Sequence, residues 1–207
     1  MDGWLDRLRE HWRGLAVALL VGALILATWQ GRALTQPAGV LAPEDPVQTD
    51  PDVLGSWTHR GHRVTPLAGF QLRARVLGAE RYRHDRPAEL SPLDLALGWG
   101  PMSDSRVLEA ITVRQQDRWY FWSAKRLPIP EGDIVRHSAN MHMIPANGAV
   151  AKQLLAARPG QLVTLRGQLV RVDGADGFHW VSSLSRADTG DGSCEVVWVE
   201  SASLADH

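Results

Sequence analysis

The stretch Gly14–Gly31, GLAVALLVGALILATWQG, has no charged residue, and Arg13 and Arg32 stand directly outside it. As an α-helix it would be about 27 Å long, close to the hydrocarbon core of a bilayer at roughly 30 Å. It lacks the polar stripe of a helix in a soluble protein, and only a helix satisfies its own backbone inside lipid. The stretch therefore predicts a transmembrane helix over residues 14–31, with the lipid bilayer as its partner.

Basic residues near the ends of this stretch predict its orientation. Residues 1–13 contain Arg7, Arg9 and Arg13, whereas Arg32 is the one basic residue that follows closely. Cytoplasmic flanks carry the excess of lysine and arginine. Residues 1–13 are therefore expected in the cytoplasm. The rest of the chain is expected across the cytoplasmic (inner) membrane, in the periplasm or outside the cell.

A cleaved signal peptide is the alternative interpretation. Gly31-Arg32-Ala33 is a small-x-small pattern that a signal peptidase accepts, with cleavage near Ala33. The apolar stretch is longer than the roughly 7–15 residues usual for a signal peptide, which favours a retained anchor. Both interpretations export the same domain.

The rest of the chain divides by composition. Residues 32–52 are rich in proline and small residues and predict an extended tether. Residues 53–201 are predicted to form one exported domain, and residues 202–207 a tail. The single cysteine, Cys194, excludes an internal disulfide, so a hydrophobic core must stabilise this domain. Cys194 itself is interpreted as a small core residue.

Hydrophobic periodicity predicts that most of this domain is β-structure. In Phe70–Val76 apolar residues alternate with polar ones, which is typical of a half-buried strand, and Gly78 is expected to form a bulge. Further strands are predicted over residues 111–123, 161–172, 178–184 and 195–199, with a second bulge at Gly167, where the parity of the apolar residues changes.

Three short helices are expected between the strands. Ser91 followed by Pro92 and Asp94 predicts a capped helix start, and Ser103 predicts a second. Ser91 and Asp94 are therefore assigned to capping and not to catalysis. Asn147 predicts the start of a third helix that runs to about residue 158.

This order of strands and helices is typical of an α+β fold, not of alternating βαβ units. Residues 159–174, PGQLVTLRGQLVRVDG, predict one long, bulged strand beside meandering partners. Together with a helix between strands, this pattern resembles an OB-like small barrel.

The segment from His137 to Met143, HSANMHM, is the first candidate site. Imidazole nitrogen with thioether sulfur is a plausible set of ligands for copper, and two histidines with a distant carboxylate would be suitable ligands for zinc. His137 and His142 are five residues apart and point to opposite faces of a strand, so both reach one transition metal only if the segment turns. The alternative is a structural role, with the histidines hydrogen-bonded and Met141 and Met143 filling the core.

A second candidate is a basic stripe of four arginines, Arg73, Arg75, Arg81 and Arg83. Outside the cytoplasm it would suit an anionic ligand such as lipid head groups, an acidic polymer or an acidic envelope protein. Nucleic acid is scarce there and is not expected. A solvated strand face is the alternative.

A third candidate is the aromatic run Trp119-Tyr120-Phe121-Trp122. If Trp119 and Trp122 are exposed they could bind sugars or an apolar partner; a buried sheet is the commoner fate of such a run.

Familiar catalytic motifs are missing from the sequence. It contains no P-loop, no G-x-G-x-x-G, no H-E-x-x-H, no C-x-x-C and no G-x-S-x-G. The leading hypothesis is therefore a single-pass, membrane-anchored envelope protein whose exported domain binds or scaffolds a partner without catalysis. The alternative is a metal-binding protein or metal-dependent enzyme centred on His137 and His142.

Overall fold

The computed structural model describes Trp12, Val17, residues 32–185, Asp188, Gly190 and residues 192–206. The chain divides into two units, Met1–Ala33 and Leu34–His207. The predicted transmembrane helix lies outside the described residues, apart from Val17. Within the described part of the chain, no helix is long and apolar enough to cross a membrane.

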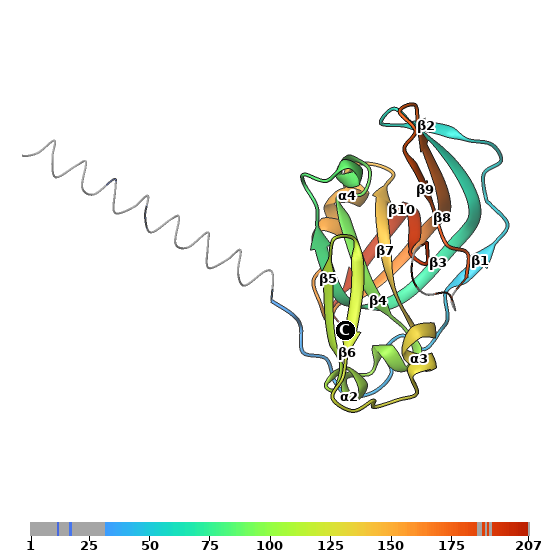
Figure 1. Cartoon of the computed structure of the whole chain (residues 1–207). Coiled ribbons are helices and arrows are strands. Elements are labelled where there is room, and N and C mark those ends of the chain that lie inside the picture. Colours follow the sequence, from blue (N-terminus) through green and yellow to red (C-terminus); the bar gives the residue numbers. More distant parts are fainter. Residues whose placement is uncertain are drawn as a thin grey trace, which may run out of the picture. The chain divides into compact units, whose positions relative to one another are not determined.

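The second unit is a mainly β domain with an eight-stranded mixed sheet, a separate two-stranded sheet and three short helices (Figure 1). The elements, in chain order, are β1 (Val47–Thr49), β2 (Trp57–His59), β3 (His62–Arg81), β4 (Leu93–Gly98), α2 (Ser105–Leu108), β5 (Thr112–Gln116), β6 (Trp119–Ser123), α3 (Glu131–Arg136), β7 (Ser138–Pro145), α4 (Gly148–Leu155), β8 (Leu162–Gly174), β9 (His179–Val181) and β10 (Glu195–Ala205).

Five strands of the large sheet pair in a closed ring. Strand β3 pairs with β4, β4 with β7, β7 with β10, β10 with β8, and β8 again with β3. The β7–β10 pairing is parallel and the other four are antiparallel. The short strands β1 and β2 pair with β3, and β9 pairs with β8.

Apolar residues on alternating positions of these strands form the main core. The predicted strand over Phe70–Val76 is confirmed as part of β3, and Phe70, Leu72, Ala74 and Val76 are all buried in this core. Met141 and Met143 are fully buried there too, as the core-filling interpretation of these residues predicted. Helix α4 covers the core with Val150 and Leu154.

Two of the predicted local signals are confirmed. The Asn147 side chain caps α4 by accepting hydrogen bonds from the backbone N–H groups of Ala149 and Val150. The pairing of β3 with β4 shifts its register between Val76 and Gly78, where the bulge was predicted.

The predicted bulge at Gly167 is wrong. The register shifts lie on the two strands that flank β8, between Pro66 and Ala68 of β3 and between Val199 and Ser201 of β10. The apolar residues change from odd to even positions along this strand because both faces of β8 are buried. Leu165 and Leu169 face the main core, whereas Val170 and Val172 belong to a second core. That second core is packed with Trp57, Phe178, Trp180 and Trp198.

Gly167 has a different role, because a Cβ at this position would lie 1.9 Å from the carbonyl oxygen of Trp198. The glycine therefore permits the close approach of β8 and β10.

The helix predicted from Ser91 is also wrong, since residues 93–98 form β4. Leu93, Leu95 and Leu97 alternate with Asp94, Ala96 and Gly98, and every residue of the strand is buried. The two-residue period prevails over the capping signal because both edges of this strand are paired, with β3 and β7. The second helix is capped by the side chain of Asp104, one residue after the predicted Ser103. Helix α3 was not predicted.

Residues 34–52, predicted as an extended tether, run along the domain. Leu34 donates a backbone hydrogen bond to Pro159, Gly100 donates one to Ala42, and Val47–Thr49 form β1. At the other end, β10 continues to Ala205, into the predicted tail. Buried apolar residues and backbone pairing therefore extend the domain beyond both predicted boundaries.

Candidate functional site

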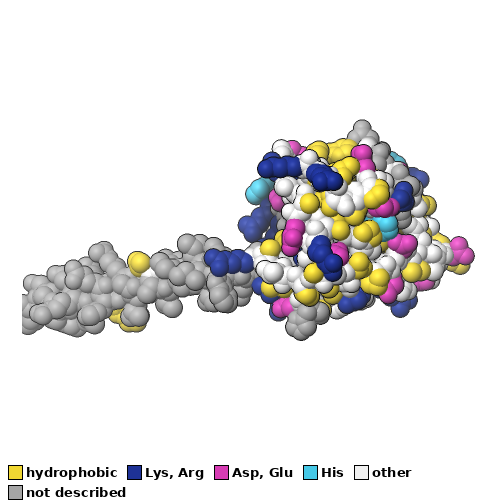
Figure 2. Space-filling view, turned by 90° about the horizontal axis from the view of Figure 1, so that it is seen from below, with side chains coloured by type: hydrophobic (Ala, Val, Ile, Leu, Met, Phe, Trp, Pro, Cys, Tyr) yellow, Lys and Arg dark blue, Asp and Glu magenta, His cyan; other side chains and the backbone are white. Residues whose placement is uncertain are grey.

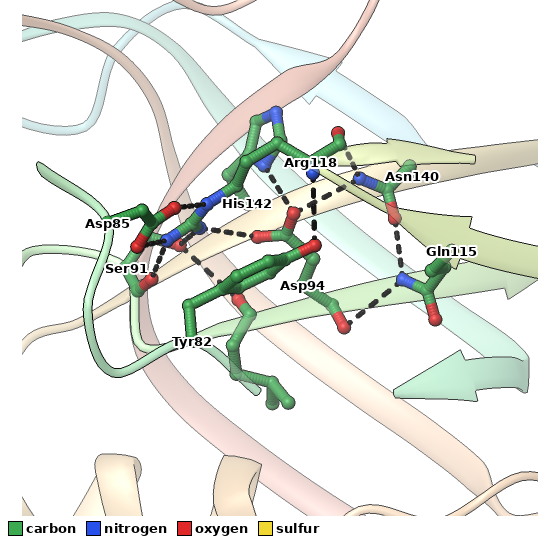
Figure 3. A network of polar contacts seen from close by, with 9 residues as sticks. Tyr82, Asp85, Ser91, Asp94, Gln115, Arg118, Asn140 and His142 are labelled. Atoms are coloured by element: carbon green, nitrogen blue, oxygen red, sulfur yellow. Dashed lines mark hydrogen bonds and ion pairs between the residues drawn. The ribbon is translucent and has the colours of Figure 1, made fainter. Parts of the chain in front are cut away.

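The central side chain of the candidate site is Asp94, which points away from the main core and is fully buried. Its Oδ1 lies 2.9 Å from Nη1 of Arg118, and its Oδ2 lies 2.9 Å from Nδ1 of His142. The carboxamide of Asn140 donates a hydrogen bond to the same Oδ2 over 3.3 Å. Figure 3 shows these side chains converging on the carboxylate, Arg118 from the turn of the β5–β6 hairpin and Asn140 and His142 from β7. An ionised carboxylate is tolerated without water only when it is paired in this way.

Arg118 reaches Asp94 from the turn of the β5–β6 hairpin. Asp117 and Arg118 form this two-residue turn with φ of 52° and 69°, the left-handed region that a type I′ hairpin requires. Non-glycine residues adopt it at some cost, so the contacts of Arg118 must compensate.

Those contacts attach the hairpin to the segment that precedes β4. Nε and Nη2 of Arg118 donate to the two oxygens of Asp85 over 2.6 and 3.0 Å. Nη1 donates to the Ser91 hydroxyl and Nη2 to the Ser91 carbonyl oxygen. The guanidinium carbon lies 3.7 Å from the centre of the Tyr82 ring.

Tyr82 itself has a perturbed hydroxyl. Burial, with the charge of Asp94 as the next cause, raises the pKa of Tyr82 to about 12.

The two strands of the hairpin are attached to β7 as well. Gln115 donates to the Asn140 carboxamide oxygen over 2.7 Å, and Asn140 donates to the Arg118 carbonyl oxygen over 3.1 Å. The hydroxyls of Tyr120 and Ser138 lie 2.9 Å apart. The hairpin therefore covers the outer face of β4 and β7 through these polar contacts. Its Val113 and Trp122 also pack against a small apolar cluster of Met102, Ile111 and Ile134.

His142 closes the network on the side of β9. Its ring centre lies 4.5 Å from that of Trp180. Its contact with Asp94 is short, but the ring N–H and the carboxylate lack the alignment of a hydrogen bond. The imidazole therefore packs against the carboxylate without a directed hydrogen bond, whereas Arg118 supplies the directed hydrogen bonds.

A pocket of about 220 Å³, here called the aromatic pocket, lies on one side of this network. Trp99, Trp119, Tyr120 and Trp122 form its apolar walls. Its polar lining consists of Ser138, Asn140, Ser185, Asp188, Ser193, Cys194 and Glu195. The described lining residues include no lysine, arginine or histidine.

A second, more open hollow of about 430 Å³, here called the basic groove, is lined by Arg118, His142 and His179 together with Phe178 and Trp180. Trp119 and Cys194 line both hollows, so the two are neighbours. The described linings differ, because the basic side chains are in the groove and the carboxylates of Asp188 and Glu195 are in the aromatic pocket.

Cys194 is placed to contact a ligand in either hollow, but its environment suppresses nucleophilic chemistry. Burial, followed by the nearby carboxylates of Glu195, Asp94 and Asp188, raises the pKa of the thiol to about 12. The thiolate is the nucleophilic form. At neutral pH this cysteine is therefore a weak nucleophile.

The structure gives the two predicted metal ligands different surroundings. Nδ1 of His137 lies 2.7 Å from the carbonyl oxygen of Asp133, at the end of α3, whereas His142 contacts Asp94. In the described part of the chain, no three His, Cys, Asp or Glu side chains are grouped to hold a metal ion. The described residues offer no third ligand beside His137 and His142, and transition-metal binding by these two histidines stays a prediction.

Of the four arginines in the predicted basic stripe, Arg75 is buried and the other three are exposed. Arg75 donates to Ser103 and Ser105, and the exposed Arg73 and Arg81 donate to the carbonyl oxygens of Leu41 and Leu155. On the face shown in Figure 2, arginine and lysine side chains are spread among acidic and apolar ones. Binding of an anionic ligand by these arginines stays a prediction.

The predicted aromatic residues Trp119 and Trp122, by contrast, come together as walls of the aromatic pocket. The strand that carries this aromatic run is only partly buried, because the side chains of Trp119 and Phe121 are 38% and 54% exposed. Asp94, Arg118 and Asn140 were missed as site residues. The alternation Leu93-Asp94-Leu95 was the signal for Asp94, since it places one carboxylate in an otherwise apolar strand.

Comparison with known proteins gives no further assignment, because no family model, no curated protein and no solved structure matches this chain.

Proposed function

We propose that the exported domain is an OB-like barrel whose outer β4–β7 face binds a ligand. Numbered along the chain, the five ring strands β3, β4, β7, β8 and β10 pair in the order 1-2-3-5-4-1, and α4 connects the third to the fourth. In OB folds, the face of strands 2 and 3 and the loops 1–2 and 4–5 carry the ligand. The corresponding parts here are β4, β7, residues 82–92 and the described residues among 175–194. They supply Asp85, Asp94, Asn140 and His142 of the network and most of the polar lining of the aromatic pocket, and the β5–β6 hairpin adds Arg118 and three aromatic walls.

The observation that carries this proposal is the aromatic pocket itself. It combines several large aromatic walls with a small number of polar groups, as ligand sites do. The buried Arg118–Asp94 pair fixes the hairpin that supplies three of those walls, so the pocket is formed before any ligand arrives. The raised pKa of Cys194 favours binding over thiol catalysis.

We further propose that residues 14–31 anchor this domain to the cytoplasmic membrane with residues 1–13 in the cytoplasm. The support is the uncharged length of that stretch and the three arginines that precede it. The protein is then a single-pass envelope protein with its binding domain outside the cytoplasm.

A ligand screen on the intact chain tests the binding function. Thermal unfolding of the purified full-length protein is followed against sugars, amines, carboxylates and short peptides, beside the variant Trp119→Ala/Trp122→Ala. A ligand that binds the pocket raises the Tm of the wild type and not that of the variant. Equal shifts in both proteins, or none in either, would contradict a binding site in this pocket.

Carboxyl-terminal reporter fusions test the topology. Alkaline phosphatase, which is active outside the cytoplasm, is expected to be active when fused after residue 207. A fluorescent protein that matures only in the cytoplasm is expected to stay dark. The reverse pattern would contradict the orientation.

A further inference from the structure

We infer that the aromatic pocket takes a single sugar ring of an envelope glycan, an inference that rests on the proposed binding function. The first argument is size. At about 220 Å³ the pocket lies below the roughly 300–1,000 Å³ of pockets that enclose drug-sized ligands. It is suited to one ring-sized unit, which can belong to a longer chain that continues into solvent.

The second argument is the pairing of aromatic walls with oxygen-bearing side chains. Trp119, Tyr120 and Trp122 of β6 all line the pocket, and Trp119 is the most exposed of the three. A sugar ring presents an apolar C–H face, which packs on an indole, and a rim of hydroxyl groups. Carboxylate, carboxamide and hydroxyl groups such as those of Asp188, Asn140 and Ser193 can exchange hydrogen bonds with that rim.

The third argument is a donor that lacks an acceptor. Trp99 is 1% exposed, lines the pocket, and its indole Nε1 has no hydrogen-bond partner among the described residues. A buried donor of this kind is costly to leave unpaired. Because Nε1 has no surface open to solvent, a ligand oxygen reaches it only once the Trp99 ring turns toward the pocket. A sugar hydroxyl supplies an acceptor oxygen, whereas a bare ammonium group supplies none.

The fourth argument is charge. The described lining residues include no cationic side chain to pair with an anionic ligand, and they include the carboxylates of Asp188 and Glu195. The aromatic pocket therefore disfavours an anionic ligand.

Calorimetric titration of the full-length protein tests the assignment. A polyoxyethylene detergent is used, since its head group is neither a sugar nor an ammonium. The probes are glucose, N-acetylglucosamine, and their β-1,4-linked tetramers cellotetraose and chitotetraose, with choline and inorganic phosphate as charged probes. Saturable binding of at least one of the sugars is expected.

Three variants locate the binding. Trp119→Ala is expected to weaken it at least tenfold. Trp99→Phe, which keeps an aromatic ring but removes the N–H, is expected to weaken it by about threefold to tenfold. Phe121→Ala is the matched control: it removes an aromatic side chain from the same strand, outside the pocket lining, and should leave affinity unchanged.

Each outcome decides the inference. The absence of saturable binding for all four sugars, or sugar binding that Trp119→Ala leaves unchanged, overturns it. Binding of choline or phosphate in place of sugars, lost in Trp119→Ala, overturns the sugar class but leaves the proposed binding function standing. If no ligand class in the thermal unfolding screen raises the Tm, both the sugar assignment and the proposed binding function are overturned.

Discussion

The two faces of strands β4 and β7 are both buried and yet differ in chemistry. The inner face carries Leu93, Leu95, Leu97, Met141 and Met143 in an apolar core. The outer face carries the buried polar side chains Asp94, Ser138, Asn140 and His142 beneath the β5–β6 hairpin. Apolar packing suffices to stabilise a sheet, so polar groups buried on one face at such desolvation cost indicate a role beyond stability. The comparison teaches that this domain separates an apolar folding face from a polar face, the proposed binding face, within single strands.

The largest expected effect comes from removing the cation on the outer face. Arg118→Met leaves Asp94 buried without its strongest partner and should lower the free energy of unfolding by about 3–5 kcal/mol. Urea denaturation of the full-length protein measures this change. The double variant Asp94→Leu/Arg118→Met removes both charges and should recover part of the loss. A change below about 1 kcal/mol in Arg118→Met would show that the pair is unimportant.

A cavity on the inner face should affect stability alone. Leu95→Ala removes a fully buried side chain and should cost about 2–5 kcal/mol, by the same urea measurement. Its affinity for any ligand found in the screen should equal that of the wild type at a temperature where both are folded. A specific loss of affinity in Leu95→Ala would contradict the separation of the two faces.

The reactivity of Cys194 reports on its burial and on the carboxylates of Glu195, Asp94 and Asp188 nearby. Because the pKa of its thiol is raised to about 12, native alkylation by iodoacetamide at pH 8 should be at least tenfold slower than in the urea-unfolded chain. The native rate should rise as the pH is increased toward 12. Unfolded thiols ionise from a pKa of about 9, so the group also makes folding less favourable as the pH rises through this interval. Mass spectrometry measures the labelling, and equal native and unfolded rates at pH 8 would contradict the assigned environment.

The smallest effect is expected at the exposed position of the hairpin. Phe121 is 54% exposed, and Phe121→Ala should change the free energy of unfolding by no more than about 0.5 kcal/mol. A larger loss in urea denaturation would place Phe121 in a packed interface and would extend the buried region beyond the network.

Local signals were readable from the sequence, whereas pairing between distant segments was not. Period-two alternation gave the strand over Phe70–Val76, and the capping residue Asn147 gave α4, because both signals are local. Asp94 was misread as a helix-capping residue because the pairing that makes β4 a strand comes from β3 and β7, at distant positions in the chain.

Arg118 could not be recognised for a related reason. Its partners Asp85, Ser91 and Asp94 lie 24 to 33 residues earlier, and only the tertiary fold brings them to the hairpin turn. Trp119 and Trp122 were singled out because an aromatic run is conspicuous in any sequence. Their shared pocket with Asp188 also depends on long-range packing.

Hydrogen exchange of the hairpin tests the central claim, that Arg118 holds residues 112–123 over the outer face. In the wild type, backbone amides of β5 and β6 should exchange slowly, as they do in the ring strands. In Arg118→Met, the account predicts that residues 112–123 lose protection while residues 93–98 and 138–145 keep theirs. Unchanged protection of the hairpin in a folded Arg118→Met variant would contradict the account.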